Sequence, residues 1–224
     1  MTAMAAMASQ VTRVSAGLVG GPQGCGILNR GKYRSVFVQQ GDLDGACGTH
    51  CLFMALMAMR VVPRAQFFRM DERKMGADLR RLYRLAQSFY FSGTDARDFR
   101  KLLALVRPKI EFDATEAMDT AAERFVARHL DQGRLVIVGI ENAARKLNHW
   151  VLAIGQAGVE RSRKFHARRF LIVDPGDMPD QLVPWNATLE TGPTANARLF
   201  RKLFDVRGEP ARVRLSGAIA LSPR

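Results

Sequence analysis

The sequence predicts an α+β fold in which a helical segment comes first and an antiparallel sheet follows. Between residues 47 and 130, apolar residues recur at the three- and four-residue spacing of helices. From residue 134 onward the chain changes to short runs rich in Val, Ile and Leu, with polar or glycine breaks, which is typical of strands. No helix long enough for a parallel crossover separates these runs, so the strands should pair antiparallel.

Four helices are expected in the first part of the chain. The first, residues 47–59 (CGTHCLFMALMAM), is apolar on every side and should therefore be buried. The β-branched pair Val61–Val62 and Pro63 should end it. The other three helices are expected at residues 76–89, 94–106 and 117–130. Thr94 is the expected N-cap of the helix over 94–106.

Four strands are expected in the second part. They are LVIVGIEN at residues 135–142, HWVLAIGQ at 149–156, RRFLIVDP at 168–175 and ARVRLSGAIAL at 211–221. The segment between the second and third of them, residues 157–167, is expected to form a long hairpin tip.

The length and the N-terminal sequence suggest a short leader and one domain. A chain of 224 residues can bury a core without disulfides or metals. Residues 1–30, rich in Ala, Met, Gly and Ser, are expected to be a flexible leader, and residues 31–224 a single domain. The leader lacks the basic start of a secretory signal, and no apolar run approaches the roughly 18 residues of a membrane span.

The cysteine count bears on the compartment. An odd number of cysteines, 3, argues against a secreted disulfide framework and favours a reducing environment. We therefore expect a cytoplasmic protein, with export by a non-classical route left open.

The formal net charge of +13 is unevenly distributed. The stretch from Arg60 to Lys109 carries about +8 and the chain from Arg161 onward about +6, a distribution that attracts anionic partners. An acidic partner protein is one candidate, and a solvated basic surface is the simpler alternative. No nucleic-acid motif or stacking-aromatic pattern accompanies the charge, so we do not expect nucleic acid to be the partner.

Cys47 is the leading candidate for a nucleophile. It stands where a loop rich in Gly and Asp changes into the buried helix. Free N–H groups and the positive end of the helix dipole stabilise a thiolate at such a position. A small packing cysteine is the alternative for a residue in this place.

His149 and Asp174 are the candidates for the base and its orienting partner. A cysteine nucleophile needs a base, usually histidine, which in turn needs an acceptor on its other ring nitrogen. His149 opens the strand at 149–156 and Asp174 lies at the end of the strand at 168–175. If these strands pair antiparallel, the two side chains lie at the same edge of the sheet. Taken singly, each could instead be a strand-end or turn residue.

Three segments, QGDLDGACGTHCLFMAL, NHWVLAIG and FLIVDPGD, together resemble the bacteriocin-processing C39 peptidases and their C39-like relatives in the papain-like clan. The resemblance implies a papain-like fold, with the nucleophile on a buried helix of the helical half and His and Asp on the C-terminal antiparallel sheet. It implies a thiol protease that cleaves a protein or peptide substrate after a Gly-Gly-like segment. Cys47, His149 and Asp174 would form its catalytic triad.

The resemblance also implies an oxyanion-hole donor. Gln40 would supply it together with the backbone N–H of Cys47. The sequence departs from the family pattern here, because Gln40 lies seven residues before Cys47 instead of six and Ala46 replaces an acidic residue. Gln39 is therefore a competing candidate for the same role.

The remaining cysteines and His50 suggest no second site. Cys25 also follows a glutamine and precedes a glycine, but no buried helix comes after it, and Cys51 should pack inside the first helix. Cys47, His50 and Cys51 complete no familiar zinc pattern, so we predict neither a metal nor a cofactor.

Three classes of function remain open: a peptidase or deconjugase, a papain-like acyltransferase, transamidase or toxin effector, and an inactive peptide-binding module. The presence of a complete Cys-His-Asp set favours an enzyme.

Overall fold

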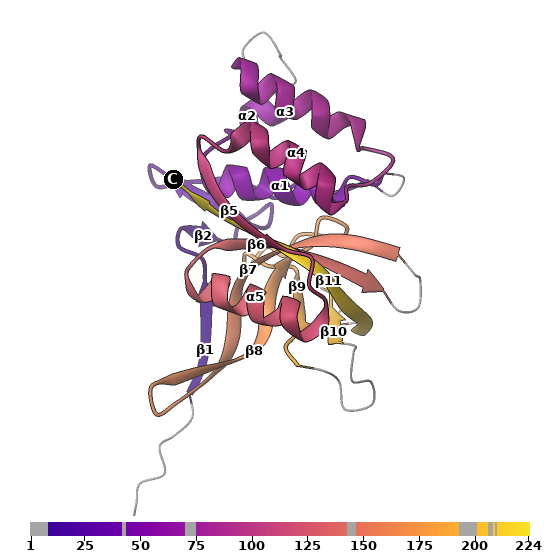
Figure 1. Ribbon diagram of the computed structural model, residues 1–224. Coiled ribbons are helices and arrows are strands. Elements are labelled where there is room, and N and C mark those ends of the chain that lie inside the picture. The colour runs from indigo at the N-terminus through magenta and orange to yellow at the C-terminus, as the bar shows by residue number, and fades with distance from the viewer. Residues whose placement is uncertain are drawn as a thin grey trace, which may run out of the picture.

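The computed structural model describes residues 9–41, 44–69, 75–142, 147–192, 201–205, 208 and 210–224. More of it is strand than helix, and a closed antiparallel barrel of six strands forms its centre (Figure 1). The barrel order is β7–β6–β11–β10–β9–β8, and β8 pairs back with β7. These strands are β6 (Leu135–Asn142), β7 (Leu147–Arg161), β8 (Lys164–Val173), β9 (Ala187–Glu190), β10 (Arg201–Phe204) and β11 (Pro210–Pro223).

The barrel corrects the predicted fold class. The prediction of a papain-like α+β chain, with a helical half followed by an antiparallel sheet, is wrong because the sheet closes on itself and other strands precede and interrupt the helices. Two of those strands extend the barrel sheet: β1 (Ser9–Val14) pairs with β7, and β5 (Ile110–Thr115) pairs with β11. Three more, β2 (Leu18–Val19), β3 (Gly26–Asn29) and β4 (Lys32–Ser35), form a separate small sheet.

The segment expected to be a flexible leader contains three of these strands. Residues 9–30 include β1, β2 and β3, whereas residues 1–8 lie outside the described residues. β1 is largely exposed and is held by backbone pairing along the edge of β7, from Ser9 opposite Glu160 to Val14 opposite Gly155. Only Val11 and Val14 of this strand are partly buried, and they lie three residues apart, so the strand leaves no alternating pattern in the sequence.

Glycines and β-bulges allow the barrel to close. The β7–β8 ladder is irregular between Ala153 and Gly155 and between Ala157 and Gly158. A Cβ atom at Gly155 would lie 2.2 Å from the carbonyl oxygen of Arg13, and one at Gly158 would lie 2.1 Å from that of His166. Bulges bend a strand and increase its twist, which a small closed sheet requires. Hydrophobic alternation does not reveal them.

Two buried clusters explain why β6 and β7 are almost continuously apolar. Val136 and Val151 belong to a cluster inside the barrel, which α5 (Asp119–Asp131) completes. Their neighbours Ile137 and Leu152 belong to a second cluster outside the barrel. Because successive strand residues point to opposite faces, both faces of these strands are buried.

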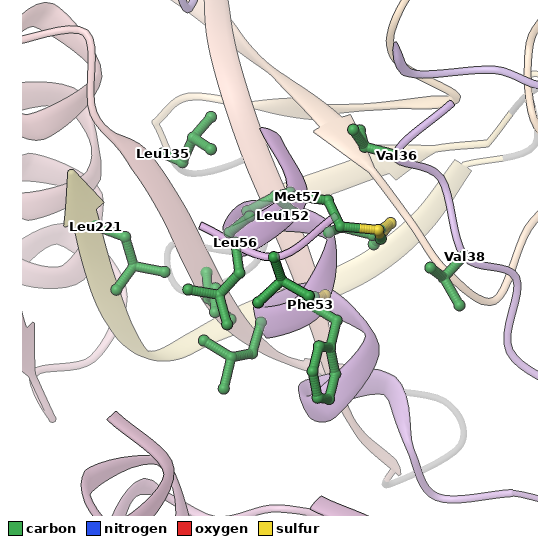
Figure 2. Packing of buried hydrophobic residues seen from close by; sticks show 14 of the residues in the cluster. Val36, Val38, Phe53, Leu56, Met57, Leu135, Leu152 and Leu221 are labelled. Carbon is green, nitrogen blue, oxygen red and sulfur yellow. The ribbon is translucent and has the colours of Figure 1, made fainter. Parts of the chain in front are cut away.

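The second cluster surrounds α1 (Cys47–Ala58). Figure 2 shows Val36 and Val38 on one side of this helix and Leu135 and Leu221 of the barrel on the other. Residues 47–57 of α1 are all buried, as the apolar sequence predicts. Outside the barrel, α1 therefore forms the centre of the hydrophobic core.

The other expected helices are also present. They are α3 (Ala77–Ser88), α4 (Ala96–Val106) and α5. The structure also contains a short helix, α2 (Arg64–Arg69), that the sequence did not predict. α4 is capped by Asp95 instead of Thr94, because the Asp95 side chain accepts from the backbone N–H of Asp98 and the two residues form a capping box. No helix among the described residues has the length and hydropathy to cross a membrane.

The long hairpin tip expected at residues 157–167 is absent. β7 and β8 continue almost to their turn, which consists of Ser162 and Arg163 with φ of 49° and 63°. Positive φ at both central residues is the geometry of a type I′ turn, which suits the twist of long paired strands. The site described next lies toward the opposite end of these two strands.

Candidate active site

Cys47 is the first residue of α1 and is 7% exposed. The N-cap residue, Ala46, makes no side-chain cap to the first turn. Gly48 brings this turn close to α4, since a Cβ atom there would lie 2.9 Å from Cβ of Thr94 and 3.1 Å from the ring of Phe99. The thiol therefore lies at an uncapped helix start, where the helix dipole favours negative charge.

Cys51 forms a hydrogen bond that links α1 to β7 next to His149. Its thiol donates to the carbonyl oxygen of Trp150 at 3.3 Å. The indole N–H of Trp150 in turn donates to the carbonyl oxygen of Thr94 at 2.7 Å. Cys51 is fully buried, and this burial raises the pKa of its thiol well above the ordinary value. These contacts give Cys51 a packing role and hold Cys47 against the strand that carries His149.

His149 lies on β7 and Asp174 directly follows β8, and these two strands pair antiparallel. Nε2 of His149 is 2.7 Å from Oδ1 of Asp174. The side chain of Cys47 also lies beside the imidazole, close enough to raise its pKa. Its thiol donates to the carbonyl oxygen of Gly45 at 3.9 Å. The structure thus brings together the three residues that the sequence analysis selected.

The environment of His149 favours its protonated form. Burial by itself lowers the pKa of the imidazole, but the hydrogen bond to Asp174 and the proximity of the Asp174 and Cys47 side chains outweigh burial and raise the pKa to about 10. An imidazolium beside a thiol is the partner that stabilises a thiolate at neutral pH. The imidazole is therefore held between the carboxylate of Asp174 and the thiol of Cys47.

The raised pKa of His149 predicts a pH-dependent contribution to stability. Because the folded-state value of about 10 exceeds the ordinary 6.5, this contribution is fully present below pH 6.5 and is lost as the pH rises through about 10. Between those limits the unfolding free energy of the native protein should fall more than that of His149→Ala. Urea unfolding at several pH values measures this difference, and equal pH dependence in both proteins would contradict the assignment.

Asn186 is a component of the site that sequence reasoning missed. It is buried, its Oδ1 accepts from the backbone N–H of Asp174 at 2.7 Å, and its Nδ2 donates to the carbonyl oxygens of Asp174 at 2.8 Å and Met178 at 3.1 Å. The backbone N–H of Gly176 donates to Oδ1 of Asp174 at 2.8 Å. These bonds fix the turn that aims the carboxylate. Asn186 directly precedes the four-residue strand β9 (Ala187–Glu190), and nothing in the sequence around it indicates these contacts.

Of the two glutamines, Gln40 is the one tied to the site. Its backbone N–H donates to the carbonyl oxygen of Pro175 at 2.7 Å, and its Nε2 donates to that of Asp44 at 2.5 Å. Gln39 is exposed and its Nε2 lies 3.4 Å from the sulfur of Met178. An amide nitrogen has two hydrogens, and the bond to Asp44 uses one of them.

Replacing Gln40 tests this distinction. Gln40→Ala should lower kcat by about 10²- to 10³-fold, as loss of one oxyanion-hole donor does in acyl-transfer enzymes. The matched variant Gln39→Ala should change kcat little. Steady-state kinetics on a peptide amide measure both, and equal losses in the two variants would contradict the choice of Gln40.

The other candidates lie elsewhere. Cys25 is buried beside the small sheet, and this burial raises the pKa of its thiol to about 12. His50 is buried within α1, and its pKa is lowered, chiefly by burial. Among the described residues, no group of three or more His, Cys, Asp or Glu side chains could hold a metal ion.

Comparisons with known proteins do not assign this site. The sequence matches no protein-family model, and no curated protein is significantly similar to it. Its interpretation therefore depends on the geometry of its own residues.

Proposed function

We propose that this chain is a cysteine peptidase in which Cys47 is the nucleophile, His149 the general acid and base, and Asp174 the residue that orients His149. The observation that carries the proposal is the position of His149, whose Nε2 is bonded to Asp174 at 2.7 Å while the side chain of Cys47 lies beside the same ring. A Cys-His-carboxylate chain of this kind is the arrangement that activates a cysteine for attack on a carbonyl carbon.

The reaction follows from these positions. The thiolate of Cys47 attacks the scissile carbonyl, and the imidazolium of His149 donates its proton to the leaving amine. The neutral His149 then removes a proton from water, which attacks the thioester and releases the acyl group. The backbone N–H of Cys47 and the side chain of Gln40 would stabilise the oxyanion formed in each step.

Exposed apolar side chains beside the site support a peptide substrate. The backbone N–H of Gly45, two residues before Cys47, donates to the carbonyl oxygen of Tyr90 at 2.7 Å, and Tyr90 and Phe91 are 41% and 82% exposed. On the side of Asp174, Met178 is 60% exposed. Apolar groups flanking a polar reaction centre are typical of sites that bind extended substrates. The resemblance to C39 peptidases adds the expectation of Gly-Gly before the cut.

Two probes test the proposal. The native protein should release the amine from an acyl-Leu-Gly-Gly-aminocoumarin peptide, and a Gly-Gly vinyl sulfone should add to Cys47, as peptide mass mapping would show. Absence of both product and adduct from pH 6 to 9 would contradict a peptidase with this specificity. Incorporation of an added amine in preference to hydrolysis would identify an acyltransferase that uses the same three residues.

A further inference from the structure

A second concave region lies at the other end of α1. It is a cavity of about 670 Å³ between the end of α1, the start of α2 and the hairpin of β3 and β4. Met57 of α1 lines it, ten residues after Cys47. A helix rises 1.5 Å per residue, so this wall lies roughly 15 Å along the helix from the proposed nucleophile. The cavity is therefore separate from the candidate active site.

The inner walls of this cavity are aliphatic. Val36, Met57, Val62, Ile27 and Pro63 contribute them, and Figure 2 shows Met57 reaching toward the side of α1 where Val36 lies. None of its described lining residues is aromatic or acidic. The volume falls in the range of about 300–1,000 Å³ that small-molecule sites occupy. Such walls suit an aliphatic chain and offer no ring for a stacked base.

Three arginines line the same cavity. They are Arg34, Arg60 and Arg64. Nη2 of Arg60 donates to the carbonyl oxygen of Leu28 at 2.9 Å, and Nη1 of Arg64 donates to that of Phe37 at 2.6 Å. The bond of Arg60 orients its guanidinium group through a neutral carbonyl, which leaves its charge in place. Arginine is the residue best suited to hold a carboxylate or a phosphate by paired hydrogen bonds.

The backbone of Arg60 shows that its position would suit glycine. The N–H of Arg60 donates to Met57 at 3.0 Å and that of Val61 to Leu56 at 2.8 Å, which is the Schellman pattern at a helix end. Arg60 has a φ of 60°, in the left-handed region where glycine is usual. Arginine at this position places a positive charge at the cavity, although this backbone conformation is less favourable for arginine than for glycine.

We propose that this cavity binds a small amphiphile that has one aliphatic chain and an anionic head group. The chain would lie against Ile27, Pro63 and Ala65, which cover the buried side chains of Val36, Met57 and Val62, and the head group would bind Arg34 and Arg60. Carboxylate and phosphate head groups share this chemistry. The site does not depend on the peptidase proposal, so Cys47→Ala should bind the same ligands with unchanged affinity.

Calorimetric titration of the full chain with decanoate and with decyl phosphate, below their micelle concentrations, tests the site. At least one should bind, while decanol and acetate, which lack the head group or the chain, should bind at least about tenfold more weakly. Tighter binding of decanoate would indicate a fatty acid as the ligand, and tighter binding of decyl phosphate a phosphate ester. The proposal would be overturned if neither decanoate nor decyl phosphate bound, or if decanol bound as tightly as they do.

Three variants distinguish binding in this cavity from nonspecific attraction to the positively charged surface. Arg60→Gly relieves the backbone conformation and should leave the protein folded, yet weaken binding at least about tenfold. Arg163→Gly removes an arginine with the same backbone conformation, φ 63°, from the β7–β8 turn and should leave binding unchanged. Ala65→Trp, an exposed lining position, should block the cavity. Native affinity in both Arg60→Gly and Ala65→Trp would contradict the assigned cavity.

Discussion

Replacing Cys47 with alanine should abolish amide hydrolysis, with kcat/KM falling by at least about 10³-fold, as loss of a catalytic nucleophile does in other triad enzymes. The thiol is small and lies at a helix start, so alanine can occupy the position without disturbing α1. The effect should therefore lie in kcat, with substrate binding retained. Steady-state hydrolysis of the Gly-Gly aminocoumarin peptide, together with thermal unfolding, measures it.

Cys25→Ala is the matched control for this variant. It removes another buried thiol, one that lies outside the site, so it should lower stability without a comparable loss of activity. Retained hydrolysis in Cys47→Ala would contradict the assignment of the nucleophile, whatever the behaviour of the control.

Asp174→Asn should have the second-largest effect, a loss of about 10³- to 10⁴-fold in kcat/KM. The carboxylate accepts from Nε2 of His149, which fixes the tautomer and stabilises the imidazolium. An asparagine has the same shape and can still accept from the N–H of Gly176, but it cannot stabilise the imidazolium in the same way. The turn should survive while the pKa of His149 falls, which NMR titration of the imidazole would detect.

Asp180→Asn provides the control in the same loop. Asp180 accepts from the backbone N–H groups of Leu182 and Val183 but is not bonded to His149. This variant should retain the activity and the imidazole pKa of the native protein. A comparable loss in both variants would mean that the loop needs its carboxylates for structure and that Asp174 has no special link to His149.

The local elements were predictable because their signals are local. Residues 51–57 are all apolar and mark a buried helix, and all residues from 47 to 57 are buried. His149 and Asp174 lie near the adjoining ends of two strands, so simple antiparallel pairing brings them together. Most of the candidate site could therefore be found from the order of its residues along the chain.

The closed barrel could not be predicted in the same way. Its curvature depends on bulges near Gly155, Gly158 and Gly217 and on short strands such as β9 and β10, which have no length to show alternation. The supporting contacts of Asn186 likewise join residues that only the finished fold places side by side. The curvature of the barrel and the contacts of Asn186 depend on tertiary contacts made when the barrel closes, and not on local secondary-structure propensity.

The rate of alkylation of Cys47 by a small electrophile from pH 4 to 9, in the native protein and in His149→Ala, tests the central claim most directly. A thiolate–imidazolium pair predicts that Cys47 reacts below pH 7 far faster than Cys25 and Cys51, whose burial raises their pKa values. It also predicts that His149→Ala removes this advantage. Equal rates for all three cysteines, or an unchanged profile in the variant, would contradict the pair and with it the proposed catalytic function.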